Sequence, residues 1–315
     1  MSSNTSGTQK AMMRALRCIS VARNMKMMTF YIFRSILFLI LLTRVVGASE
    51  IKSLKNIRYG RPHQKTLLMD LYLPSGSDPA QLPVVLYIHG GGWESGDKKY
   101  SGGWYMPLLG HGFAVASINY RLSGQAPFPA QLYDVKTAVR FLRANAERFG
   151  LDPDRIGAFG DSAGAHLAFL LGTTGGLEVF EGDGPWKSAS SRVMAVCGLY
   201  GPVDLMALEK KHPFSEPGGI LESLLGGPVP ERQKVAVMAS PISHVSPDDP
   251  PFLIVHGEKD LLVPYGQSVA LYRQLKARGV DVTLHLVEGA GHGKGFGKAT
   301  RDIIVEFFLD KLKKP

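Results

Sequence analysis

The sequence predicts one α/β domain, built on a mostly parallel sheet that begins with an antiparallel strand and carries helices on both faces. Five runs of residues are apolar on both faces of the expected strand, which is typical of strands buried beneath helices in a parallel sheet. Stretches with the helical spacing of apolar residues lie between these runs. The five runs are residues 84–90, 113–120, 155–160, 193–201 and 252–257.

The first strand is expected at residues 66–73, where Leu67, Met69, Leu71 and Leu73 follow a period of two. This period favours a half-exposed, antiparallel strand. Residues 151–157 (LDPDRIG) predict a turn from a helix into a strand. Helices are expected at residues 132–149, 163–171, 267–278 and 300–312, and one more strand is expected at residues 281–288.

Two regions depart from this alternation of strands and helices. Residues 173–191 are rich in Gly, Ser and acidic side chains, and residues 202–250 contain several prolines and a short helical piece near residues 220–225. Residues 202–250 follow an expected sheet strand, and residues 173–191 follow the expected helix after Ser162. They therefore either fold over the carboxyl edge of the sheet as a small lid or form surface loops, and the sequence leaves both interpretations open.

The first 48 residues differ in charge from the rest of the chain. The net charge is +9, from 36 Lys and Arg against 27 Asp and Glu. Seven of the basic residues and none of the acidic residues lie in residues 1–48, so residues 49–315 are close to neutral. The basicity therefore belongs to the leader, and it does not indicate a nucleic-acid partner.

The leader itself has three interpretations. Its apolar core, residues 36–42, is shorter than the ~20 residues that span a bilayer. Residues 46–48, Val-Gly-Ala, have the pattern of a signal-peptidase site. The segment is thus a cleaved signal peptide of an exported, periplasmic or extracellular protein, an uncleaved membrane anchor, or the product of a wrongly assigned start, which would leave the protein cytoplasmic. In each case residues 49–315 form the expected catalytic domain.

Only two cysteines are present, Cys18 in the leader and Cys197 in an apolar run. This number excludes a disulfide framework in the mature domain and disfavours a cysteine metal site. We expect Cys197 to be a buried core residue. We expect no metal or cofactor, and the sequence is silent on the oligomeric state.

The motif GDSAG, residues 160–164, lies between a predicted strand and a predicted helix. A serine between two glycines in this context is typical of a nucleophile on a sharp strand-to-helix turn, where larger neighbours would collide. Ser162 is therefore the candidate nucleophile, and it requires a base to remove its proton.

The candidate acid and base follow later strands. Asp260 comes three residues after the run 252–257; Glu258 and Asp204 are its rivals. His292 lies in a glycine-rich loop after the strand 281–288, whereas His285 and His256 lie within or at the end of strands and are interpreted as packing or hydrogen-bonding residues. The order Ser, acid, His is that of one fold class of serine hydrolases.

The sequence HGGGW, residues 89–93, directly follows the strand residues VVLYI, 84–88. Successive glycines leave backbone N–H groups uncovered, so those of Gly91 and Gly92, with that of Ala163, are candidate donors to an oxyanion. A phosphate loop would need a Lys followed by Ser or Thr after the glycines, and the sequence Trp-Glu-Ser there does not supply it.

Six motifs together resemble the α/β-hydrolase esterases, in the branch that contains hormone-sensitive-lipase-like carboxylesterases and bacterial acetyl and feruloyl esterases. The resemblance runs from about residue 55 to the end of the chain. The motifs, in family order, are HGGGW (89–93), NYRLS (119–123), FPAQLYD (128–134), GDSAG (160–164), HGEKDLLVP (256–264) and GAGHG (289–293).

The resemblance implies an α/β-hydrolase fold with a small lid or none, and it places the family's roles on this chain. Its nucleophile, acid and base fall on Ser162, Asp260 and His292. Its oxyanion donors fall on Gly91, Gly92 and Ala163, and its bracing residues fall on Tyr120, Arg121 and Asp134. Ala165 departs from the family, whose members often have glycine there; because this position faces helix packing, we expect no loss of activity. Residues 49–65 are too short and polar for the N-terminal helical cap of many relatives.

The expected function is that of a serine carboxylic-ester hydrolase acting on short-chain acyl or polysaccharide esters, such as acetyl or feruloyl groups. Trp93, Trp104 and Phe128 lie in loops near the expected cleft and either contact substrate or anchor those loops. The alternatives are a peptidase or formamidase on the same fold, a lipase, and a binding module without catalysis. A lipase would favour a large apolar lid, and a binding module would not require every catalytic element.

Overall fold

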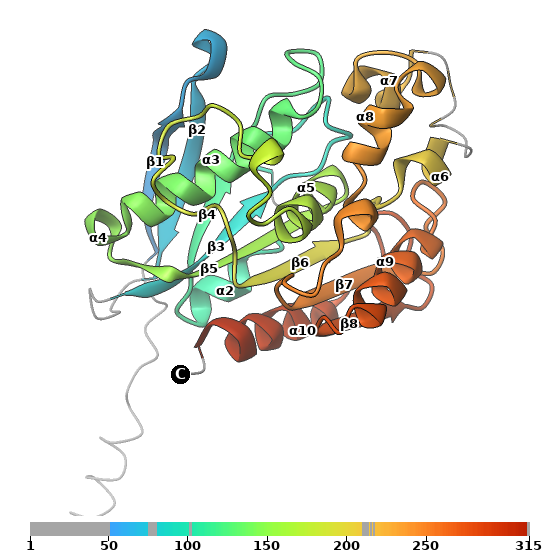
Figure 1. Ribbon diagram of the computed structural model, residues 1–315. Helices are drawn as coiled ribbons and strands as arrows, with labels where there is room; N and C mark the ends of the chain where they lie inside the picture. Colours follow the sequence, from blue (N-terminus) through green and yellow to red (C-terminus); the bar gives the residue numbers. More distant parts are fainter. Residues whose placement is uncertain are drawn as a thin grey trace, which may run out of the picture. The chain divides into compact units, whose positions relative to one another are not determined.

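The computed structural model describes residues 51–74, 81–100, 103–209, 214, 216 and 218–313 (Figure 1). These residues form an eight-stranded sheet in the order β1-β2-β4-β3-β5-β6-β7-β8. β2 is antiparallel to both β1 and β4, and the other neighbours are parallel. This confirms the predicted fold class. The strands are β1 (Lys52–Gly60), β2 (Leu67–Leu73), β3 (Leu82–Ile88), β4 (Ala114–Ile118), β5 (Leu151–Asp161), β6 (Ala195–Leu199), β7 (Phe252–Gly257) and β8 (Val282–Val287).

β1 is the strand that the sequence does not predict. Most of its residues are exposed, and they include Lys52, Lys55 and Arg58, so no apolar alternation marks the strand. Its backbone nevertheless pairs with β2, for example Ile57 with Met69. An edge strand of this kind is held by its hydrogen-bond ladder and its neighbours more than by burial of its own side chains.

β5 contains the turn that was expected before it. Leu151 pairs with Leu82, and the next pair is Ile156 with Val84, so residues 152–155 bulge out of the ladder. Asp152 closes the bulge by accepting hydrogen bonds from the backbone N–H of Asp154 and from the Arg155 guanidinium. The predicted turn is therefore present as a bulge at residues 152–155, but β5 begins before it, at Leu151.

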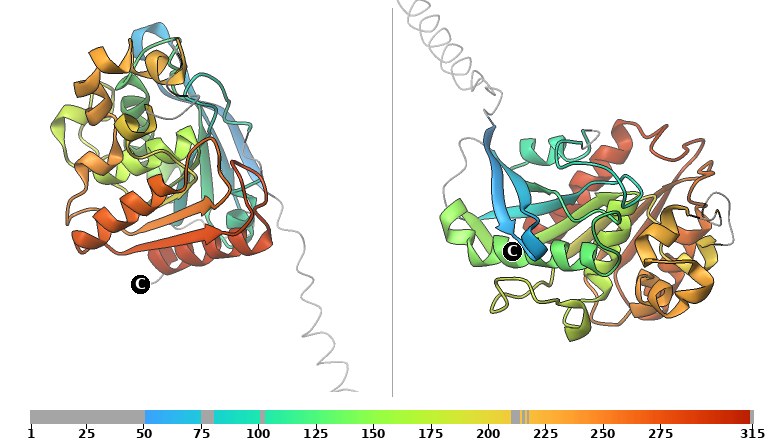
Figure 2. Two further views of the ribbon diagram at one scale, coloured as in Figure 1. Left: turned by 90° about the vertical axis from the view of Figure 1, so that its right-hand side faces the viewer. Right: turned by 90° about the horizontal axis from the view of Figure 1, so that it is seen from above.

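Helices cover both faces of the sheet (Figures 1 and 2). One hydrophobic cluster packs on each face, and each includes buried helical residues such as Leu167 on one face and Phe308 on the other. The predicted helix at residues 132–149 is divided at Asn145. The first face carries α3 (Ala130–Ala144), α4 (Ala146–Phe149), α5 (Ala163–Thr173) and α9 (Gly266–Ala277), and the second carries α2 (Met106–Gly110) and α10 (Lys298–Phe308).

The chain between β6 and β7 forms a group of short helices, α6 (Leu205–Glu209), α7 (Ile220–Leu225) and α8 (Gln233–Met238) (Figure 1). They bury Leu221, Leu224 and Ala236 in the core of the first face. Residues 173–191 instead lie against α3, where Glu181 forms ion pairs with Lys136 and Arg140. Of these two regions, only the chain between β6 and β7 contributes described residues to the candidate active site.

Cys197 is buried in β6, as predicted. The predicted leader, residues 1–48, lies outside the described residues. Among the helices of residues 51–313 that the structure describes, none combines the length and the apolar character needed to cross a membrane.

Candidate active site

Ser162 occupies the single position between the end of β5 and the start of α5. Its φ of 51° and ψ of −120° are strained for a residue with a side chain. A Cβ on Gly164 would lie 2.0 Å from the carbonyl oxygen of Ile88, and one on Gly160 would lie 2.4 Å from the backbone of Gly164. The turn therefore requires glycine at both positions, because any larger residue would collide with the backbone, as the motif predicts.

In the structure, the side chains of Ser162, His292 and Asp260 form a continuous series of hydrogen bonds. The Ser162 Oγ lies 2.9 Å from the His292 Nε2, and the His292 Nδ1 lies 2.8 Å from the Asp260 Oδ2. Ser162 follows β5, Asp260 follows β7 and His292 follows β8, so the chain after three strand ends at the same edge of the sheet supplies these groups. A hydroxyl, an imidazole and a carboxylate in this order can transfer a proton away from the hydroxyl.

The carboxylate of Asp260 is buried and fully hydrogen-bonded. Its Oδ1 accepts the backbone N–H groups of Leu262 and Val263, and its Oδ2 lies 3.2 Å from the His256 Nε2. Burial alone would raise the pKa of Asp260, but the hydrogen bonds from His256, His292 and Val263 outweigh it and hold the pKa below its usual range. Asp260 is therefore ionised and can hold the His292 proton on Nδ1.

The rival residues occupy other positions. Glu258 is exposed, and Asp204 accepts the backbone N–H of Ala207 at the start of α6. His256 is buried beside Asp260 and is fixed by the Ser268 hydroxyl and the Val263 carbonyl. His285 lies within β8. Of these four residues, only His256 contacts the series formed by Ser162, His292 and Asp260, and its partner there is the Asp260 carboxylate.

The glycine loop after β3 faces Ser162. Gly91, Gly92, Ser162 and Ala163 all line one cavity. Within the described part of the chain, the backbone N–H groups of Gly91, Gly92 and Ala163 have no hydrogen-bond acceptor. Three unpaired donors beside a nucleophile suit the stabilisation of a negatively charged oxygen.

Three contacts fix this loop. The Tyr120 hydroxyl donates to the carbonyl of His89 at 3.0 Å, and the Ser123 N–H donates to the carbonyl of Trp93 at 2.8 Å. The Trp93 Nε1 donates to the Nδ1 of His166 at 3.1 Å. The loop is thus held in place before any ligand binds, as electrostatic stabilisation of a transition state requires.

Arg121 and Asp134 form a buried ion pair next to Tyr120. The Arg121 Nε and Nη2 donate to the carboxylate, and the shortest distance is 2.7 Å. Burial raises the pKa of Asp134, and the bonds from Arg121 oppose that shift. Because each partner satisfies the other, the pair is structural, in agreement with the bracing role that the family resemblance implies for both residues.

The cavity at Ser162 has a volume of about 240 Å³ and apolar walls. Phe214 and Ile220 come from the chain between β6 and β7, and Leu262 follows Asp260. Ile220 lies against the glycine loop, since a Cβ on Gly92 would meet two of its carbon atoms at 3.4 Å. A cavity of this size and lining suits a short apolar group beside the nucleophile.

Aromatic side chains pack against the His292 imidazole. The Tyr200 ring lies edge-on to His292 with centroids 4.7 Å apart, and it also packs against Phe296 at 5.3 Å. Phe296 in turn contacts Trp104, which hydrogen-bonds the Tyr200 hydroxyl. Burial holds the pKa of Tyr200 well above its usual range, so the phenol stays neutral. This packing restricts the orientation of His292 in a loop rich in glycine.

The three aromatic residues named from the sequence differ in position. Trp93 is buried at its indole N–H but lines the cavity at Ser162. Trp104 and Phe128 are buried, at 8% and 5% exposure, and neither lines that cavity. Trp104 packs against Phe296, and Phe128 belongs to the core of the first face. Their burial favours the loop-anchoring interpretation for both.

Sequence reasoning missed His166 and Tyr200. His166 lies one helical turn after Ser162, and its imidazole joins Trp93 to the carbonyl of Ala239, the residue that follows α8. Both residues lie in apolar surroundings with partners distant in sequence, so no local pattern marks them. The described residues contain no group of three His, Cys, Asp or Glu side chains arranged to hold a metal ion.

Comparison with known proteins gives one family and several relatives. Residues 69–275 match the BD-FAE family model. Esterase LipC of Mycobacterium tuberculosis is 32% identical over 234 residues, which cover 69% of this chain and 58% of that protein. Esterase LipQ of the same organism is 33% identical over 229 residues, covering 71% of this chain and 53% of that protein. The chain thus spans little more than half the length of these relatives.

Two solved structures resemble the fold over most of the chain. A truncated carbohydrate esterase from gut microbiota has a TM-score of 0.74 and 33% identity, with 84% of this chain and 97% of that chain covered. A bifunctional GH43-CE protein of Bacteroides eggerthii has a TM-score of 0.75 and 34% identity, with 82% and 38% covered.

Proposed function

This chain belongs to the BD-FAE family, and from that premise we propose that it is a serine hydrolase of carboxylic esters with short acyl groups, carried by small molecules or polysaccharides. The hydrogen-bonded line from Ser162 through His292 to Asp260, next to the unpaired N–H groups of the glycine loop, is the observation that carries the proposal. The names of LipC and LipQ, both esterases, support the same reaction.

In the first half of the reaction, the His292 Nε2 takes the proton of the Ser162 hydroxyl while the Oγ attacks the carbonyl carbon of the ester. The carbonyl oxygen becomes negatively charged, and the N–H groups of Gly91, Gly92 and Ala163 stabilise it. Asp260 stabilises the imidazolium that forms. His292 then donates its proton to the alcohol oxygen, the bond from that oxygen to the carbonyl carbon breaks, and the acyl group stays on Ser162.

In the second half, water takes the place of the alcohol. His292 removes a proton from the water, and the resulting hydroxide attacks the acyl carbon. The same N–H groups stabilise the second oxyanion. His292 returns the proton to the Ser162 Oγ as the acid leaves, so that the enzyme is restored.

The apolar cavity of about 240 Å³ supports a short acyl group, because Ile220 and Phe214 limit the space beyond the glycine loop. The structural neighbour described as a carbohydrate esterase supports a sugar as the alcohol. The substrate that we propose first is therefore an acetylated polysaccharide, from which the protein removes acetyl groups.

The experiment measures hydrolysis of nitrophenyl esters from acetate to dodecanoate and of acetylated xylan, with an aminoacyl nitroanilide as the test for peptidase activity. We expect the highest kcat/KM with acetate or butyrate and no cleavage of the anilide. Ser162→Ala should lose about 10⁴-fold or more in kcat. Ser53→Ala, on the exposed edge strand, is the matched control. Full turnover by Ser162→Ala would refute the mechanism, and a preference for dodecanoate would refute only the assignment of acyl length.

A further inference from the structure

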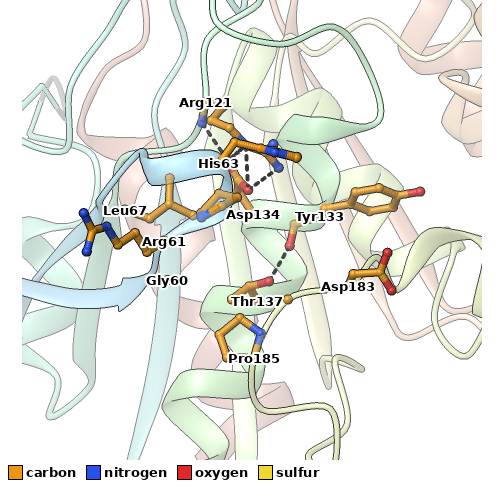
Figure 3. Close-up of a pocket in the computed structure, with 12 residues that line it drawn as sticks. Gly60, Arg61, His63, Leu67, Arg121, Tyr133, Asp134, Thr137, Asp183 and Pro185 are labelled. Carbon is orange, nitrogen blue, oxygen red and sulfur yellow. Dashed lines mark hydrogen bonds and ion pairs between the residues drawn. The ribbon is translucent and has the colours of Figure 1, made fainter.

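A second cavity has a volume of about 510 Å³, and Figure 3 shows the residues that line it. Leu67, one of them, lies at the carboxyl edge of the sheet, where Ser162 also lies. It is bordered by the end of the β1–β2 hairpin, by α3 and by residues 183–185. β2 is antiparallel to β4, so the Leu67 end of β2 lies beside the carboxyl end of β4. β2 and β5 are three strand positions apart, which corresponds to about 14 Å along the sheet.

One wall of this cavity is fixed to α3 by buried charges and close backbone packing. Glu181 lies 2.8 Å from the ammonium of Lys136 and 2.6 Å from the guanidinium of Arg140, and both of these side chains are almost fully buried. A Cβ on Gly184 would lie 2.5 Å from the Thr137 hydroxyl, so the loop approaches the helix as closely as a backbone can. The position of the loop is therefore set in advance.

The opposite wall and the floor are fixed as well. The Trp186 indole donates a hydrogen bond to the carbonyl of Tyr59 in β1, which ties the loop to the hairpin. The Arg121–Asp134 ion pair forms part of the floor. Its charges neutralise each other, so the floor carries no net charge. The other two charged lining residues, Arg61 and Asp183, are exposed and opposite in sign. A cavity with fixed walls loses little entropy when a ligand binds.

The lining groups combine hydrogen-bonding tips with apolar surfaces. His63 stands on the hairpin, and Tyr133 and Asp183 stand on the other side (Figure 3). Leu67 and Pro185 supply apolar surface between them. The Asp183 side chain is fully exposed; its Oδ1 accepts a hydrogen bond from the Lys187 ammonium at 3.0 Å, and its Oδ2 remains as an acceptor for a ligand. The imidazole of His63 is exposed too. Donors and acceptors around an apolar, aromatic wall suit a ring with hydroxyl groups on its rim and C–H groups on its faces.

We propose that this cavity is a distal sugar subsite, which binds a neutral pyranose unit of the chain whose ester lies at Ser162. The proposal rests on the proposed function, since it extends the alcohol side of the same substrate. A sugar unit is about as long as one strand spacing, ~5 Å. The polymer must therefore continue for about three units beyond the esterified one to reach the cavity.

The test compares the protein with the double variant His63→Gly/Asp183→Ala. Glycine accepts the φ of 43° at position 63, and both side chains are exposed, so the fold should persist. The control, His111→Gly/Asp281→Ala, removes the same residue types from exposed positions that precede β4 and β8 at the other edge of the sheet. The substrates are acetylated xylohexaose, acetylated xylobiose and nitrophenyl acetate, and binding of unacetylated xylohexaose is measured separately by calorimetry.

We expect the unmodified protein and the control to prefer the hexamer over the dimer in kcat/KM. The double variant should lose this preference by about tenfold, which corresponds to two hydrogen bonds, while its rate on nitrophenyl acetate stays within about twofold. Unacetylated xylohexaose should bind the control more tightly than the double variant. Equal preference and equal binding in all three proteins would overturn the subsite. Failure to hydrolyse nitrophenyl acetate would instead overturn the esterase function, and the binding measurement would still decide the subsite.

Discussion

His166 makes the stability of the fold sensitive to acid in a way that can be measured. The side chain has no exposed surface; its Nε2–H donates to the carbonyl of Ala239 at 2.7 Å and its Nδ1 accepts from the Trp93 indole. Burial lowers the pKa of His166 from 6.5 to about 4, and the bond to Ala239 only partly opposes that shift. The folded protein therefore keeps this imidazole neutral under conditions in which the unfolded chain binds a proton.

The sign and size of the effect follow from that difference. Below pH 6.5 the unfolded chain takes up a proton that the folded protein does not bind until about pH 4, so the free energy of unfolding falls as the pH falls through this window. Between pH 7 and pH 5 the loss amounts to about 2 kcal/mol, and it reaches about 3 kcal/mol near pH 4.

The assay is urea unfolding at pH 7 and pH 5, followed by tryptophan fluorescence, for the unmodified protein and for His166→Gln. The variant should be less stable at pH 7 by about 1–3 kcal/mol, because the Trp93 N–H loses its acceptor. Its loss between pH 7 and pH 5 should be smaller than that of the unmodified protein by about 2 kcal/mol. His111→Gln, which replaces an exposed histidine, is the matched control. Parallel pH dependences for His166→Gln and the unmodified protein would refute the reasoning.

Three further predictions concern the site and its support. Asp260→Asn should lower kcat on nitrophenyl acetate by about 10³–10⁴-fold with little change in KM, because an amide can present an N–H to the His292 Nδ1 and favour the wrong tautomer; a normal kcat would contradict the role of the carboxylate. Ile220→Ala should enlarge the cavity and move the kcat/KM optimum toward longer acyl chains, whereas Ile220→Val should keep the original order; an unchanged optimum in the alanine variant would exclude this wall as the limit. Gly164→Ala should prevent accumulation of folded protein, since the new methyl group would lie 2.0 Å from a backbone oxygen, and the control Gly266→Ala, which meets no atom within 4 Å, should show normal circular dichroism and melting; a folded Gly164→Ala protein would contradict the packing at the elbow.

The sequence predicts the parts of this molecule whose signal is local. The buried strands stand out because apolar residues occupy both faces of each run, and Ser162, Asp260 and His292 each follow a strand by a few residues. In contrast, His166 contacts partners that are 73 residues away on either side, and nothing in the helix around it indicates them. β1 escapes prediction for a related reason, because its stability comes from β2 and not from its own pattern.

The second cavity shows the same limit more strongly. Its walls come from three separate parts of the chain, residues 60–67, 121–137 and 183–185, and none of them carries a motif that points to a ligand. The ion pairs that hold the loop join Glu181 to residues 41 and 45 positions earlier. Such a site becomes visible only when the tertiary structure is known, whereas the elbow at Ser162 is visible in five consecutive residues.

The exposed edge strand β1 has a consequence for how this protein behaves at high concentration. Unpaired edges of sheets invite a second molecule to add a strand, which begins aggregation. Here the register of β1 shifts twice along its length, between Leu54 and Ile57 and between Arg58 and Gly60, and the strand carries Lys52, Lys55 and Arg58. A neighbouring copy would face an irregular ladder and a row of like charges. Both features disfavour the pairing of β1 with the sheet edge of a second copy.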